Sequence, residues 1–255
     1  MATTTAPTLP FDLRVAKAAL AAKDERLARL IEETVDFHIE TESMDSPYEA
    51  LMESIAYQSI SGKAAATIFA RIKALGKNGR PPTPQEMLKL RPQKLRKAGL
   101  SGAKVRAMKD LAQKTIDGIV PTLEEAQKMS DEELVERLVS VRGIGAWTVE
   151  MFLIFRLGRP DVLPIHDLGV KKGWAVTYGK KRMPKPKELQ AFGERWRPYR
   201  TVASWYMWRA FERAGYKATN KISKALAKKR KTRLQTAQVL RPKKGRSRTR
   251  RRRSR

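Results

Sequence analysis

Apolar side chains recur at helical spacing along most of this 255-residue chain. Leu, Ile, Val, Met or an aromatic residue returns after every three or four positions, with charged residues between, which is the pattern of amphipathic helices. It predicts helices over residues 12–22, 24–36, 47–58, 61–75, 101–118, 131–139, 145–157, 167–177, 186–194 and 199–213. Alternation with a period of two is scarce, and residues 119–121 (IVP) are too short a run to build a sheet. The pattern therefore predicts an all-α protein.

The two ends of the chain lack this pattern. Residues 1–10 are short and Thr-rich, and we expect them to be disordered. Residues 220–255 have few large apolar side chains and many like charges, which predicts a basic tail that is disordered without a partner. The helical domain is accordingly assigned to residues 11–219.

A glycine-containing turn joins two of the expected helices at residues 141–145 (VRGIG). Gly143 can take a positive φ, and neither it nor Gly145 blocks the close approach of another backbone. The helix that follows points its free N–H groups and its positive dipole end out at the glycines, which makes an anion site. The alternative is an ordinary glycine that ends a helix.

Asp167 stands directly before another apolar helix, at the position of an N-cap. Capping alone would explain it. The functional alternative is a carboxylate beside the sugar of a bound nucleotide. There it would stabilise the positive charge that builds up at C1′ as the base departs, and it would orient or deprotonate the attacking water.

Charge favours a polyanionic partner. Lys and Arg number 54 against 26 Asp and Glu, which gives a net charge of +28. Residues 221–255 hold 17 basic residues and no acidic one, while the rest of the chain still carries +11. Such a balance is typical of proteins that bind nucleic acid.

Composition also excludes several kinds of site. The chain has no cysteine, which excludes disulfides, thiolate zinc sites and a cysteine-held iron–sulfur cluster. Its two histidines are too few for a metal site. No apolar run approaches the roughly 18 residues of a membrane span, and we expect neither membrane insertion nor a secretory signal.

Five segments between Pro47 and Phe211 together resemble the helix-hairpin-helix DNA glycosylase superfamily, and most of all its 3-methyladenine DNA glycosylase II branch. They are residues 57–65 (YQSISGKAA), 99–105 (GLSGAKV), 138–148 (LVSVRGIGAWT), 164–170 (PIHDLGV) and 196–208 (WRPYRTVASWYMW). The resemblance implies two α-helical subdomains that hold damaged double-stranded DNA in the cleft between them. We expect no counterpart here of the β-rich N-terminal domain of some bacterial relatives.

The resemblance also implies the reaction. Asp167 falls on the family's catalytic aspartate, and Trp147 falls where lyase members place a lysine nucleophile. An indole cannot form a Schiff base with the sugar. We therefore expect a monofunctional hydrolase of base excision repair that leaves an intact abasic site. Lys171 and Lys172 lie one turn after Asp167, where either amine could in principle act as the nucleophile instead; a phosphate contact is the role that we expect of them.

Alkylated purines such as 3-methyladenine and 7-methylguanine fit this chemistry. Alkylation at N3 or N7 makes the base cationic and a good leaving group, so no general acid is needed. Aromatic rings attract such a base by cation–π stacking, worth about 0.5–2 kcal/mol. Trp147 and Trp208 match pocket positions of the family, Tyr48 and Tyr57 are weaker candidates, and Met151 replaces an aromatic residue of a bacterial relative. Core packing is the alternative for each aromatic residue.

DNA contacts are expected from the hairpin amides of Gly143 and Gly145, and from Gly102 and Lys104 in a second turn. The tail adds affinity that depends on salt and not on sequence.

The loop at Gln58 and Ser59 matches the family's wedge, which fills the space of the everted base. Serine is small for that task, so Gln58, Ile60 or another residue is the wedge.

The resemblance further implies that backbone carbonyls of Val139, Val141 and Ile144 can hold a monovalent cation, and no other cofactor is expected. We expect a monomer. Residues 228–231 (KKRK) and 250–253 (RRRR) resemble nuclear import signals, so the expected compartment is the nucleus in a eukaryote and otherwise the cytoplasm with the nucleoid. Two other functions stay open: a non-catalytic helix-hairpin-helix DNA-binding protein, and a glycosylase of the same fold that removes deaminated bases.

Overall fold

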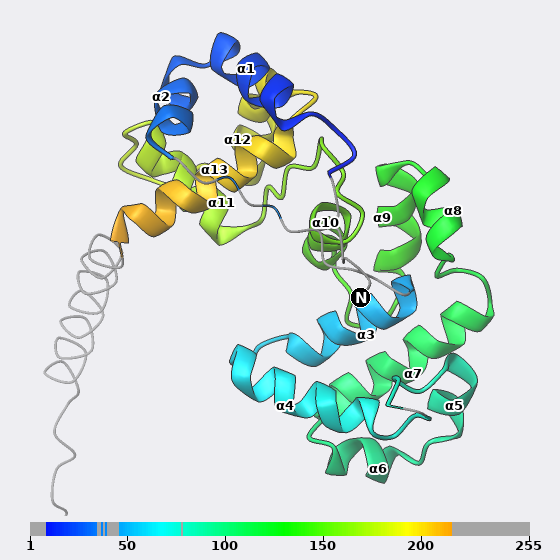
Figure 1. Cartoon of the computed structure of the whole chain (residues 1–255). Helices are drawn as coiled ribbons and strands as arrows, with labels where there is room; N and C mark the ends of the chain where they lie inside the picture. Colours follow the sequence, from blue (N-terminus) through cyan, green and yellow to red (C-terminus); the bar gives the residue numbers. More distant parts are fainter. Residues whose placement is uncertain (1–8, 35–36, 38, 40–45, 78, 216–255) are drawn as a thin grey trace, which may run out of the picture. The chain divides into compact units, whose positions relative to one another are not determined.

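Helices account for all the regular structure in the part of the chain described by this computed structural model, which is residues 9–34, 37, 39, 46–77 and 79–215 (Figure 1). No strand occurs in these ranges. The helices are α1 (Leu13–Lys23), α2 (Glu25–Glu33), α3 (Pro47–Tyr57), α4 (Gly62–Lys73), α5 (Pro84–Lys89), α6 (Pro92–Lys97), α7 (Gly102–Ile116), α8 (Leu123–Lys128), α9 (Asp131–Val139), α10 (Ala146–Phe155), α11 (Leu168–Thr177), α12 (Pro186–Gly193), the 3₁₀ helix η1 (Glu194–Trp196) and α13 (Arg200–Arg213). The expected all-α class is confirmed.

All ten expected helices are present, with ends that differ by up to three residues. The sequence pattern missed α5, α6 and α8, because six residues are too few to show a helical period. The expectations for residues 1–8 and for the tail from residue 216 onward lie outside the described residues.

Side-chain caps fix where many helices begin. A hydroxyl or carboxylate at the N-cap accepts a hydrogen bond from an amide of the first turn, which stabilises a helix by about 1 kcal/mol. Such caps are Asp12, Asp24, Ser46, Ser61, Thr83, Ser101, Thr122, Ser130 and Asp167. At Thr83 and Thr122 a glutamate three residues later completes a capping box.

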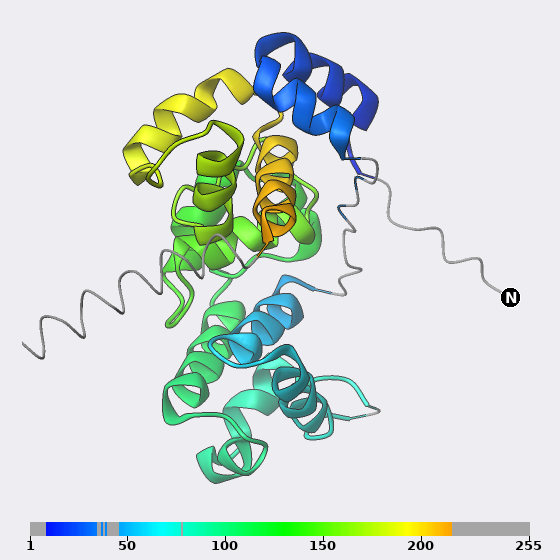
Figure 2. The ribbon, with the colours of Figure 1, turned by 90° about the vertical axis from the view of Figure 1, so that its left-hand side faces the viewer.

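Contacts divide the helices of residues 9–211, which form one compact unit, into two groups. In the first, α2 packs against both α1 and α11, and η1 packs against α1 and α12. In the second, α7 packs against α3, α5 and α6, while α10 packs against α3 and α9. Figure 1 and Figure 2 show the first group at one end of this unit and α3–α7 at the other.

A buried carboxylate joins α2 to residues from much later in the chain within the first group. Asp24, only 7% exposed, caps α2 and accepts hydrogen bonds from the Tyr178 hydroxyl at 2.6 Å and the Trp196 indole at 3.3 Å. These bonds satisfy a charge that would otherwise be costly to bury. The hydroxyl and the indole come from residues more than 150 positions away along the chain.

Two glycines let α11 and α13 pack closely: Gly173 meets the backbone of Met207, and Gly169 meets the ring of Trp208. A methyl group at Gly173 would lie 1.8 Å from the carbonyl oxygen of Met207, and one at Gly169 would lie 2.7 Å from the Trp208 ring. Both distances are impossible for a real side chain, so only glycine allows this approach. It brings Trp208 to the start of α11, where Asp167 lies. Within the described residues, none of the helices has the length and apolar character that crossing a bilayer requires.

Candidate active site

Asp167 is the N-cap of α11, as its sequence position predicts. Its amide donates to the Pro164 carbonyl oxygen at 2.9 Å, and its Oδ1 accepts from the Val170 amide at 2.8 Å. This turn fixes both the backbone and one oxygen of the carboxylate. The side chain stays partly open to solvent.

Two tryptophans converge on the same carboxylate. The Trp208 indole donates from α13 to Asp167 Oδ1, and the Trp147 indole donates from α10 to Oδ2, each at 2.8 Å. Trp147 is 48% exposed, whereas Trp208 is partly buried and stacks on Phe155 with ring centroids 5.7 Å apart. Three residues that the sequence analysis selected separately therefore form one hydrogen-bonded cluster.

A small pocket opens between α3 and α10, on the helical face that carries Trp147. Met151 and Phe155 follow Trp147 at intervals of four residues, which places all three on one face. The pocket has a volume of about 230 Å³ and is lined by Glu53, Ser54, Tyr57, Met151, Phe152, Phe155 and Arg156. That is below the roughly 300–1,000 Å³ of pockets for drug-sized ligands and suits a single planar base.

Tyr48 does not line this pocket. Its side chain is 5% exposed, and its hydroxyl donates to the Pro82 carbonyl oxygen at 3.1 Å. Core packing, the alternative considered for each aromatic residue, is what the structure shows for Tyr48. Tyr57, nine residues later at the end of α3, is 36% exposed and does line the pocket. Phe155 also lines this pocket and was not among the predicted site residues, although its spacing of eight residues from Trp147 is a usable signal.

The glycine turn between α9 and α10 has the backbone that the sequence predicts. Gly143 has a φ of +81°, and its Cα faces Ala107 on α7, where an added methyl group would lie 3.3 Å away. A methyl group at Gly145 would meet no protein atom within 4 Å. Neither glycine amide has a hydrogen-bond acceptor within the described residues, whereas the Arg142 amide donates to Asp110 Oδ2 at 2.7 Å. Two amides thus remain available to an anion.

A second loop is tied to this hairpin. Gln58 follows α3, and its side-chain amide donates to the Gly143 carbonyl oxygen at 2.9 Å. The Lys104 ammonium donates to the carbonyl oxygens of Ala56 and Gln58 at 2.8 and 2.7 Å, and burial lowers the pKa of this lysine. Ser59, next along the loop, takes a φ of +59°. Lys104 therefore supports the loop, and its direct contact with DNA stays a prediction, as does that of Gly102 at the start of α7.

Ile60 is 40% exposed, and Ser59 is also exposed. Gln58 differs from both because its side chain is engaged with the hairpin. Which of these residues enters the duplex stays a prediction.

The carbonyls expected to hold a cation surround the same hairpin. Val139 ends α9, the Val141 carbonyl oxygen accepts from the Ile144 amide at 3.0 Å, and Ile144 is buried. Lys171 lies in the first turn of α11, where its amide donates to the Asp167 carbonyl oxygen at 3.1 Å. The cation and the Lys171–phosphate contact stay predictions.

A second carboxyl lies near Asp167. Glu150 is one turn beyond Trp147 on α10, and its Oε2 is buried without a hydrogen-bond partner in the described part of the chain. Burial raises the pKa of Glu150 to about 7, and the negative charge of Asp167 adds to the rise. Glu150 could not be predicted as a site residue from the sequence, because a single glutamate in an apolar helix belongs to no motif.

Comparison with known proteins decides the family. The model described as "HhH-GPD superfamily base excision DNA repair protein" matches residues 52–198, which is more than half of the chain. The chain belongs to the HhH-GPD superfamily. Among HhH-GPD relatives, DNA-3-methyladenine glycosylase 1 of Schizosaccharomyces pombe is 39% identical over 206 residues, which cover 80% of this chain and 90% of the relative.

Two solved HhH-GPD structures have the same fold. One is S. pombe 3-methyladenine DNA glycosylase (Mag1) in complex with abasic DNA, with a TM-score of 0.69 and 38% identity over 76% of this chain and 95% of that chain. The other is DNA-3-methyladenine glycosidase from Bacillus halodurans, with a TM-score of 0.71 and 31% identity over 80% of this chain and 91% of that chain. The family resemblance inferred from the sequence motifs is confirmed.

Proposed function

We propose that this protein is a DNA glycosylase that hydrolyses the N-glycosidic bond of alkylated purines in duplex DNA and leaves an abasic site. The observation that carries the proposal is the cluster at Asp167, whose carboxylate accepts hydrogen bonds from the indole N–H groups of both Trp147 and Trp208. Relatives named for 3-methyladenine support the choice of substrate.

The chemistry follows from the positions of these groups. The amides of Gly143 and Gly145 bind a phosphate of the damaged strand, because both glycines are exposed just before α10 and neither amide has an acceptor within the described residues. The everted base stacks on Trp147, whose ring is half exposed beside the carboxylate. A pocket lined by Met151 and Tyr57 receives it.

Bond cleavage needs one negative group and one water. As the C1′–N bond breaks, its electron pair goes to the cationic base, which leaves as a neutral molecule. Asp167 stabilises the positive charge that develops on the sugar. The oxygen of water then forms a bond to C1′ and loses its proton to Asp167 or to solvent, so no acid has to protonate the base.

The absence of strand cleavage is part of the proposal. In the family resemblance, Trp147 falls where lyase members carry a lysine nucleophile, and an indole forms no Schiff base. We also propose that the carbonyls of Val139, Val141 and Ile144 hold a monovalent cation that stiffens the hairpin. Borohydride is not expected to trap the protein on DNA, and a covalent adduct would show an amine nucleophile instead.

A base-release panel tests the function. Duplexes that carry 3-methyladenine, 7-methylguanine, hypoxanthine or uracil are incubated with the protein, and the free base is measured. We expect release of the two alkylated purines, and Asp167→Asn is expected to slow it by about 100-fold or more while DNA affinity changes by only a few fold. DNA binding without release of any base would instead identify a binding protein that has lost catalysis.

A further inference from the structure

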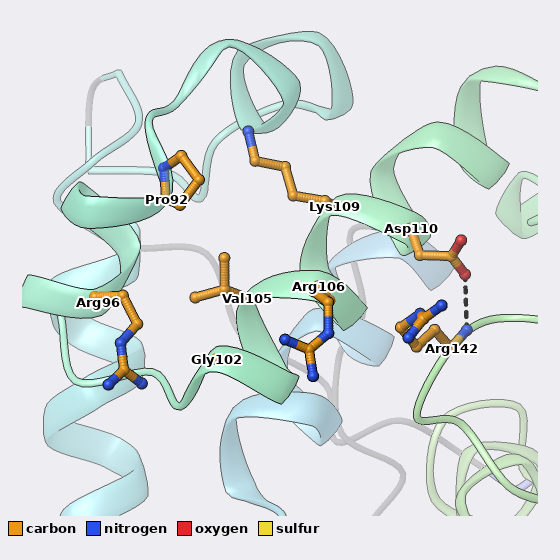
Figure 3. A pocket seen from close by; sticks show the side chains of 8 residues that line it. All are labelled: Pro92, Arg96, Gly102, Val105, Arg106, Lys109, Asp110 and Arg142. Carbon is orange, nitrogen blue, oxygen red and sulfur yellow. Dashed lines mark hydrogen bonds between the residues drawn. The ribbon is translucent and has the colours of Figure 1, made fainter.

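A groove with a volume of about 530 Å³ runs between α6, α7 and the glycine hairpin (Figure 3). Arg96, Arg106, Lys109 and Arg142 line it, and Asp110 is the one acidic residue among the lining residues. In Figure 3, Arg106 lies between Arg96 and Arg142. A strongly positive groove next to the hairpin has no role in the site described above.

Two of the five charges are used within the protein. The Lys109 ammonium donates to the carbonyl oxygens of Met87, Leu88 and Leu90 at 2.5–2.7 Å, so all three of its protons hold the end of α5. Asp110 Oδ2 accepts a hydrogen bond from the backbone amide of Arg142 at 2.7 Å, which is the dashed line in Figure 3. Neither group is available to a ligand, and Asp110 serves to fix the hairpin to α7.

The arginine side chains are available. One guanidinium nitrogen of Arg96 donates a hydrogen bond to the Leu100 carbonyl oxygen at 2.8 Å, and the remaining N–H groups of this side chain are available to a ligand. Arg106 and Arg142 are exposed, and their guanidinium groups have no ion pair or hydrogen-bond acceptor within the described residues. The groove therefore presents guanidinium donors with no acceptor of their own.

The groove continues into the hairpin site. A smaller hollow of about 140 Å³ is lined by the same two residues, Arg106 and Arg142, together with Gln58 and Gly143. An extended polyanion held at the hairpin glycines can therefore run on past both guanidinium groups.

We propose that Arg106 and Arg142, with Arg96 beyond them, form a second binding site for phosphodiester groups of the DNA backbone. Guanidinium groups bind phosphate oxygens through paired hydrogen bonds, and each phosphate contact releases condensed counterions. The proposal rests on the proposed function in so far as DNA is the ligand. These arginines extend the contact with the DNA backbone beyond the phosphate that the hairpin amides bind. They do not distinguish one base sequence from another.

The test is a double variant, Arg106→Gln with Arg142→Gln, against a control of equal charge change, Lys181→Gln with Lys187→Gln. Both control lysines are exposed on the α11–α12 segment and line neither hollow. Binding is measured to a duplex with a tetrahydrofuran abasic analogue between about 50 and 300 mM salt. The groove variant should lower the slope of log affinity against log salt by about 1–2 and weaken binding about 5- to 50-fold at low salt.

Phosphate scanning locates the contact. Single methylphosphonate groups neutralise one phosphate of the duplex at a time, and the wild-type protein should lose affinity at one or two positions where the groove variant loses none. Equal slopes for wild type and groove variant, or an equal loss in the control variant, would overturn the proposal. The proposal would also be overturned if the groove variant lost affinity at every methylphosphonate position at which the wild-type protein loses it.

Failure of the proposed function gives a different result. Single-turnover base release by the wild-type protein at saturating DNA tests the glycosylase proposal on its own, because it does not depend on the salt slope or on the groove variant. A protein that releases no base but shows the expected slope change would refute the glycosylase proposal and leave the groove assignment standing. A melting temperature equal to that of wild type shows that the groove variant is folded.

Discussion

Glu150 makes a quantitative prediction about stability and pH. It lies one turn after Trp147, with Oε2 buried and without a partner in the described part of the chain. Burial and the charge of Asp167 raise its pKa from 4.5 to about 7. Glu150→Gln keeps the shape of the side chain and removes its ionisation, so it isolates the free energy of placing that charge in the fold.

The sign follows from proton binding. Between about pH 4.5 and 7 the folded protein holds the Glu150 proton and the unfolded chain does not, so the free energy of unfolding falls as pH rises through this window. Full separation of the two pKa values is worth about 3 kcal/mol. Because the side chain is only partly buried, solvent screens part of this, and we expect about 1–2 kcal/mol.

Urea unfolding at about pH 5 and about pH 8 measures the effect. The variant should be close to wild type at the lower pH and more stable by about 1–2 kcal/mol at the higher one. Other charged groups share the pocket that Glu150 lines: Asp131, Glu132, Glu136, Asp161, Arg197 and Arg200. Their titration is common to both proteins and cancels in the difference.

Glu136→Gln is the matched control, since it removes an exposed carboxylate from the same pocket. A stability gain for Glu150→Gln that is equal at both pH values, or equal to that of the control, would refute the reasoning.

The remaining predictions concern the hairpin and the cluster around it. Gly145→Ala should keep stability within about 0.5 kcal/mol and weaken DNA binding about tenfold in a duplex titration, since the methyl group meets only the ligand, whereas Gly143→Ala should cost about 1–2 kcal/mol of unfolding free energy through its positive φ. Lys104→Met should lower the rate of base release more than DNA affinity, because it frees the loop carbonyls, and equal losses would argue against a positioning role. Trp208→Phe keeps the stack on Phe155 but removes one hydrogen bond from Asp167, so base release should slow by about 10- to 100-fold with the melting temperature little changed, as a single-turnover assay can show.

Local patterns explain what could be predicted from the sequence. The helices have an apolar period and capping residues within a few positions of their ends, so ten of them could be placed. Asp167 and the glycine turn are local too, because a cap and a positive φ depend on the neighbouring residues.

Contacts between distant residues could not be predicted in the same way. The bond from Gln58 to Gly143 joins positions 85 residues apart, and the Lys104 ammonium meets carbonyls more than 40 residues earlier. Tyr48 and Tyr57 share one helix, and only the packing of α3 shows that the first belongs to the core and the second to the pocket. The composition shows that the chain is rich in arginine, but only the fold shows that Arg96, Arg106 and Arg142 line one groove.

A carboxylate offers about four acceptor positions. At Asp167, Val170 and Trp208 occupy the two on Oδ1, and Trp147 takes one on Oδ2. The attacking water would use the remaining position on Oδ2, next to the Trp147 ring on which the base is proposed to stack. Under the proposed function, replacing Trp147 by a smaller residue that admits bulkier lesions would also remove a hydrogen bond from Asp167, so the range of lesions and the rate of cleavage would both depend on this one indole.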